Sequence, residues 1–202
     1  MTNDLFADFL HADAQGLRVD AKRAATALVN SVSTQDDKIA WTLANLERLQ
    51  TNGASRIRHE IYEGIVFPAL KARFECGDPE ASYQLGRTWQ NFISKPCFTE
   101  ELGWYSAEDF YRIAYQKEPG SLRYERALLE RLLEKLAYLF HEWPAGILID
   151  HRQWRDEIIS LREDIDFASS IDRSSDHAEA LSEWAIMTDQ YRDRLDKRDG
   201  SS

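Results

Sequence analysis

Apolar residues recur at helical spacing along almost all of the 202-residue chain, and no stretch alternates between apolar and polar residues as a half-buried strand would. The segment from Ser121 to Glu142 has the strongest pattern, because its apolar residues fall on one wide stripe. This stripe consists of Leu122, Leu128, Leu129, Leu132, Leu133, Leu136, Leu139 and Phe140. We therefore predict an all-α helical bundle of about eight or nine helices.

Residues that begin helices mark the boundaries between these segments. Asp78 suits an N-cap, and Pro79 suits the first helical position. Ser106 is followed three residues later by Asp109, a spacing typical of a capping box. Helices are therefore expected to begin after Asp78 and Ser106.

The segment from Ile61 to Leu70 is apolar on nearly every side, so this helix is expected inside the fold. Pro68 lies within it, and a proline clashes with the carbonyl four residues earlier, which here belongs to Gly64. We expect a kink between Gly64 and Pro68.

Composition is that of a globular chain, with 43% hydrophobic and 30% charged residues. We predict a single domain over residues 1–195, with the best candidate for a flexible joint at residues 169–175. Residues 196–202 are expected to form a disordered tail.

Two cysteines, Cys76 and Cys97, are too far apart for a metal knuckle and too few for a disulfide scaffold. Both are expected to be free, buried thiols. The first residues show no basic region followed by an apolar stretch, and the longest run without a polar side chain, Gly64 to Leu70, is too short for a bilayer. A cytoplasmic location is therefore expected.

A formal net charge of −10 disfavours nucleic acid and anionic membrane surfaces as partners, because both attract an excess of Lys and Arg. The same charge favours a basic protein partner. Simple solubility explains the acidity equally well.

The stretch from Ala72 to Trp89 contains Gly77-Asp78, Ala81, Tyr83, Leu85-Gly86 and an aromatic residue at its end. It resembles the helix–turn–helix core of SEL-like repeats, which are relatives of the tetratricopeptide (TPR) repeats. The resemblance implies a TPR-like hairpin and a scaffold or adaptor that binds a peptide or helix near Tyr83 and Trp89. It covers one unit only, and no tandem copy follows.

Catalytic and metal motifs are incomplete. His59 and Glu63 are spaced as in a zinc-protease helix, but that motif needs a second His where Glu63 stands. Asp8 and His11 have the spacing of one half of a di-iron site, and no second half occurs. No metal, cofactor or catalytic residue is therefore predicted, and a non-enzymatic role is favoured.

The segment from Phe98 to Tyr115 interleaves aromatic and acidic residues, a composition typical of surfaces that anchor a basic partner. Alternatively, the rings cover the core while the acids are solvated. The residues predicted to bind a partner are Glu100, Glu101, Trp104, Tyr105, Glu108, Asp109 and Tyr111.

Three hypotheses follow. The first is an acidic helical protein that occludes a basic protein partner, as bacterial immunity proteins and antitoxins do. The second is the TPR-like adaptor. The third is a ligand-binding or enzymatic bundle with a site formed by at least two of His59, Glu63, His141 and His151. The sequence indicates nothing about oligomeric state.

Overall fold

The computed structural model describes residues 2–51, 57–141 and 154–199, and every regular element in these ranges is helical. The prediction of an all-α fold is confirmed. None of the described helices combines the length and the apolar character needed to cross a bilayer.

Contacts between residues divide the chain into two compact units, Met1–Glu118 and Pro119–Ser202. The boundary lies immediately before Pro119, and Pro119 and Gly120 stand between the end of α9 and the start of the next helix. Residues 169–175, the expected joint, instead lie inside the second unit. The prediction of one domain over residues 1–195 stays a prediction.

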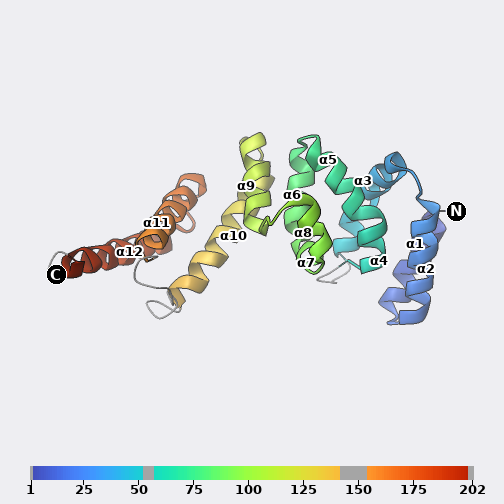
Figure 1. The fold of residues 1–202 in the computed structure, drawn as a ribbon, viewed down its shortest axis with the longest axis horizontal. Helices are drawn as coiled ribbons and strands as arrows, with labels where there is room; N and C mark the ends of the chain where they lie inside the picture. Colours follow the sequence, from blue (N-terminus) through green and yellow to red (C-terminus); the bar gives the residue numbers. More distant parts are fainter. Residues whose placement is uncertain (1, 52–56, 142–153, 200–202) are drawn as a thin grey trace. The chain divides into compact units, whose positions relative to one another are not determined.

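In the first unit the helices follow one another in chain order, and each packs against near neighbours in the sequence (Figure 1). The packed pairs include α1 with α2, α2 with α4, α3 with α5, α5 with α6, and α6 with α9. The elements are α1 (Thr2–Ala14), α2 (Arg18–Ser31), α3 (Gln35–Thr51), α4 (His59–Ile61), the π-helix η1 (Tyr62–Val66), α5 (Phe67–Glu75), α6 (Pro79–Arg87), α7 (Trp89–Ile93), α8 (Pro96–Leu102) and α9 (Ala107–Lys117).

The disruption expected near Pro68 takes the form of a π-helical turn. The three elements α4, η1 and α5 follow one another without a break, and the backbone N–H of Phe67 bonds to the carbonyl of Tyr62, five residues earlier. Pro68 has no N–H to donate, so the wider turn occurs where a regular helix would lack a bond. The side-chain amide of Gln35 donates to the Pro68 carbonyl at 2.9 Å and ties α3 to this turn.

Two glycines allow close helix packing in this unit. A Cβ atom at Gly64 would lie 2.5 Å from a methyl carbon of Val29, so α2 approaches η1 only because the side chain is absent. A Cβ atom at Gly86 would lie 2.6 Å from the ring of Tyr111, which brings α6 against α9 in the same way.

The core between α5 and α9 is built from aromatic rings. Phe67 and Phe98 have ring centroids 3.9 Å apart, and Phe110 lies 5.5 Å from Phe92 and 5.6 Å from Phe74. Phe110 is fully buried. These rings fix α8 and α9 against α5, which positions the surface described below.

The second unit contains α10 (Leu122–His141), α11 (Trp154–Ile171) and α12 (Ala178–Asp199), with α11 packed against both α10 and α12. Buried leucines of α10 include Leu128, Leu132 and Leu136, as predicted, whereas Leu122 at the first position of the helix is exposed. The last helix continues to Asp199, so residues 196–199 are helical rather than part of a disordered tail.

Both cysteines are free but exposed, which corrects the prediction that they are buried. Cys76 is the last residue before the Gly77 turn, and Cys97 lies in the first turn of α8. Residues at helix ends face solvent more readily than those at helix centres, and composition alone does not distinguish the two positions.

Candidate functional site

The acidic and aromatic segment predicted to bind a partner folds as α8, a short link and the first part of α9. Phe98 of α8 packs on Tyr62 and Phe67, so one face of this short helix is buried. Tyr105 in the link packs on Phe74 and Phe110. These contacts hold the segment on a rigid base.

Between these anchors the chain turns outward at Gly103. Its φ of 105° is in a region that favours glycine, and its N–H closes α8 by bonding to the Thr99 carbonyl at 2.8 Å. The next residue, Trp104, is 79% exposed. A large aromatic side chain is thus presented to solvent from a link that is packed on both sides.

Two acidic side chains at the end of α8 lie close to Trp104 in the chain. Glu100 is exposed. Glu101 is 48% exposed, and its carboxylate lies 3.1 Å from the ammonium of Lys71 on α5. The hydrogen bond to Glu101, together with the charge of Glu75, raises the pKa of the Lys71 ammonium. We call Glu100, Glu101 and Trp104 the Trp104 surface.

The other four predicted contact residues have structural partners. Asp109 completes a capping box with Ser106, which begins α9, and Glu108 pairs with Arg112 at 2.9 Å. Tyr111 is half-buried against Gly86, and Tyr105 is half-buried on the core. The hypothesis that rings cover the core therefore describes these two tyrosines. The exposed contact residues are those of the Trp104 surface and Asp109, whose carboxylate is used in the capping box.

A groove with a volume of about 310 Å³ adjoins this surface along α5. We call it the α5 groove. Phe67, Pro68, Ala72 and Phe98 supply apolar lining, and Gln35 and Lys71 add polar groups. Three carboxylates line it as well: Glu63, Glu75 and Glu101. Because these residues come from α3, η1, α5 and α8, nothing in the sequence indicated that they meet.

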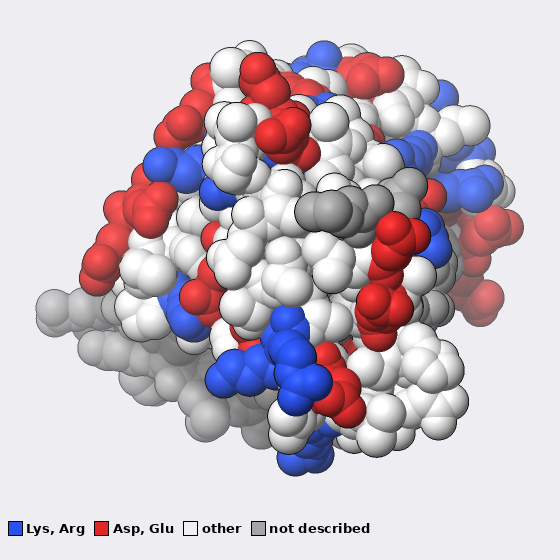
Figure 2. Space-filling view, turned by 90° about the vertical axis from the view of Figure 1, so that its right-hand side faces the viewer, with Lys and Arg blue, Asp and Glu red and all other residues white. Residues whose placement is uncertain are grey.

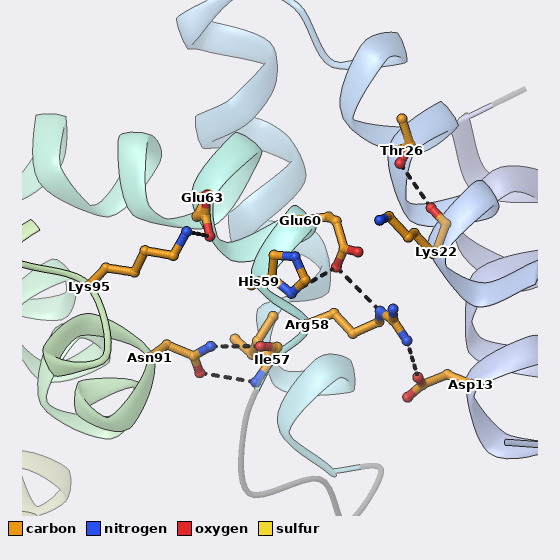
Figure 3. Close-up of polar contacts among 10 residues, drawn as sticks. All are labelled: Asp13, Lys22, Thr26, Ile57, Arg58, His59, Glu60, Glu63, Asn91 and Lys95. Atoms are coloured by element: carbon orange, nitrogen blue, oxygen red, sulfur yellow. Dashed lines mark hydrogen bonds and ion pairs between the residues drawn. The ribbon is translucent and has the colours of Figure 1, made fainter. Parts of the chain in front are cut away.

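A second polar cluster surrounds α4 and links it to α1 (Figure 3). The guanidinium of Arg58 lies 3.7 Å from the Asp13 carboxylate and 3.3 Å from that of Glu60. Burial raises the pKa of the Glu60 carboxyl, but hydrogen bonds from its own backbone N–H and from Arg58 outweigh it, so the pKa is lowered. This cluster fixes the start of the helix.

The residues of the hypothetical enzymatic site do not converge in the first unit. His59 is exposed and pairs with Glu60 at 3.3 Å, whereas Glu63 pairs with Lys95 at 2.5 Å (Figure 3). His141 ends α10 in the second unit, and His151 lies outside the described residues. Within the described ranges, no group of His, Cys, Asp and Glu side chains could hold a metal ion.

The residues that the adaptor hypothesis assigns to peptide binding are used in packing. Tyr83 is only 9% exposed, and its ring lies 5.9 Å from that of Tyr111. The indole N–H of Trp89 donates to the Tyr105 carbonyl at 3.1 Å. Tyr83 is therefore buried, whereas Trp89 is only partly buried.

The acidity is not gathered on the face formed by the N-terminal helices. Figure 2 shows the side of the molecule that lies to the right in Figure 1. Acidic and basic side chains are interspersed with uncharged surface on it. One pair of opposite charges on α2 joins Asp20 and Arg23 at 3.2 Å. Balanced charge of this kind gives no preference for a basic partner.

No protein-family model matches the sequence, and comparisons with curated proteins and with solved structures give no significant match. The resemblance of Ala72–Trp89 to a SEL-like hairpin therefore stays a prediction.

Proposed function

We propose that the protein is a non-enzymatic binding protein that occludes a basic protein partner through the Trp104 surface. The observation that carries the proposal is the exposure of Trp104, which is 79% accessible on a link anchored by Phe98 and Tyr105. Tryptophan is enriched among residues that dominate binding energy, and a rigid base reduces the entropy lost when it binds.

The charge of the surface supports a basic partner. Glu100 and Glu101 precede Trp104 at the end of α8, and the whole chain carries a net charge of −10. Acidic groups around an aromatic anchor accelerate association with a basic protein and make it sensitive to salt. Immunity proteins and antitoxins act by occlusion of this kind, and we propose the same mode here.

The test is affinity capture from the native cell extract at low and at moderate salt, followed by binding measurements with the purified partner. Trp104→Ala should weaken binding by at least tenfold, because hot-spot residues contribute about 2 kcal/mol or more. The matched control is Tyr138→Ala on α10, which removes another exposed aromatic ring, 73% accessible, in the second unit. Equal affinities for the two variants would refute the proposal.

A second test measures whether the acidic side chains accelerate association with the partner. Glu100→Lys with Glu101→Lys should lower the association rate and reduce its dependence on salt. The same charge change at Glu179 and Glu183, both exposed on α12, is the control. Asp109 is unsuitable for this test, because its replacement would also remove the capping box of α9.

A further inference from the structure

We propose that the α5 groove receives a lysine or arginine side chain of the basic partner that binds the Trp104 surface. This inference rests on the proposed function and adds where, and by which chemistry, the partner is recognised. Glu101 belongs to the Trp104 surface, and it also lines the α5 groove. A partner seated on Trp104 could therefore extend a side chain into the groove.

The size and lining of the groove suit a long cationic side chain. Its volume of about 310 Å³ is at the lower end of small-molecule pockets, which matches one side chain better than a cofactor. Phe67, Pro68 and Phe98 offer apolar surface for the methylene stem. Lysine and arginine bury such stems while the charged group stays near water or a carboxylate.

The carboxylates are placed to bind the charged end. Glu75 is 57% exposed and Glu101 is 48% exposed, so both remain accessible from outside. Of the three lining carboxylates, Glu63 is paired with Lys95 and the other two share the ammonium of Lys71, which leaves an excess of one negative charge. This complementarity commits the groove to a cation rather than to an apolar or anionic group.

The protein's own Lys71 shows how a cation is held there. Its ammonium lies 3.1 Å from the Glu101 carboxylate and 3.7 Å from that of Glu75, bridging both. An incoming lysine or arginine would share or replace these contacts. Lys71 is therefore an internal competitor for the site.

The decisive measurement uses an acetylated hexa-arginine peptide, with hexa-citrulline as the uncharged counterpart of nearly the same shape. Amide NMR spectra of the labelled protein should shift at residues 67–75 and 98–101 with arginine only. Glu75→Gln with Glu101→Gln should weaken peptide binding roughly threefold to tenfold, since each accessible ion pair contributes modestly. The same two-charge change at Glu179 and Glu183 should leave the shifts at α5 intact.

Lys71→Met should increase the affinity for the peptide, a result that would not be expected if Lys71 only stabilised the fold. Removing the internal ammonium frees two carboxylates, so the hexa-arginine peptide should bind roughly threefold more tightly. Lys197→Met, an equal change of charge on exposed α12, controls for the general rise in acidity. Weaker binding to the Lys71 variant, or equal tightening in the control, would overturn the inference.

Failure of the groove and failure of the proposed function are distinguishable. Glu75 lines the groove but is not part of the Trp104 surface, so Glu75→Gln tests the groove alone. If Trp104→Ala abolishes partner binding while Glu75→Gln leaves it unchanged, the groove inference is wrong and the proposed function stands. Peptide-induced shifts spread over exposed carboxylates throughout the protein, rather than confined to α5 and α8, would also overturn it.

Discussion

The two units of this chain bury different kinds of polar group. Among the described residues of the first unit, the buried polar side chains are neutral, and they include Asn45, Gln84 and Asn91. In the second unit, three carboxylates are buried within the described residues: Glu125, Asp164 and Asp172. The aromatic core cluster, by contrast, lies wholly in the first unit and extends from Phe6 to Phe110.

The two units therefore differ in the polar groups that accompany their buried apolar side chains. The rings of the first unit stabilise it through apolar burial, which changes little with salt or with mild changes in pH. In the second unit, the buried leucines of α10 and the stacked rings of Phe140 and Trp184 are accompanied by two ion pairs, Arg173 with Glu125 at 2.6 Å and Lys135 with Asp164 at 2.7 Å. The Trp104 surface lies on the unit that contains the cluster of buried aromatic rings.

The largest effect is expected from Phe110→Ala. Phe110 is fully buried among Phe74, Phe92 and Tyr105, so its removal should lower the free energy of unfolding by about 3–5 kcal/mol. Urea denaturation measures the loss, and residue-resolved hydrogen exchange locates it. Exchange should accelerate in the first unit, and equal acceleration throughout α11 and α12 would contradict the comparison.

A smaller effect is expected from Glu125→Gln in the second unit. The carboxylate is buried but its partner Arg173 is more than half exposed, so we expect a loss of about 1–2 kcal/mol. A double-mutant cycle with Arg173→Met measures the pairwise contribution. Glu134→Gln, which breaks the exposed pair with Arg131, is the control and should cost less than about 0.5 kcal/mol.

The smallest effect concerns pH in the first unit. The pKa of Glu60 is lower in the folded protein than its ordinary value of 4.5, so its contribution is present above that value and is lost as the pH falls through the folded pKa. Glu60→Gln should lower stability by roughly a few tenths of a kcal/mol at pH 7 and by less in acid. Urea titrations from about pH 3 to pH 7 test this. If the stability difference between the wild-type protein and Glu60→Gln grew as the pH fell, the pKa of Glu60 would be raised rather than lowered by folding.

Helix ends in this chain were predictable because their signals are local. Asp78 accepts the N–H of Glu80 at 2.9 Å, and Ser106 forms the capping box expected with Asp109. The ion pair between Arg131 and Glu134 likewise joins residues three positions apart on α10. Such features depend on residues three or four positions apart, which the sequence displays directly.

Features that depend on distant residues could not be predicted in this way. Glu125 is buried and pairs with Arg173, which lies 48 positions later in the link between α11 and α12. The α5 groove requires Gln35, Pro68 and Glu101 to meet, and their separation hides it. Of the predicted contact residues, composition alone could not separate exposed Trp104 from half-buried Tyr105 and Tyr111.

The π-turn at Tyr62–Val66 makes the phase of one helix depend on a single residue. A π-turn has one residue more than the α-helical turn that would replace it, so everything after it is rotated by about 100° around the helix axis. Deleting one residue there would restore regular winding and turn Lys71 and Glu75 away from Glu101. Register along this helix, rather than the identity of its carboxylates, would then decide which face of α5 meets α8.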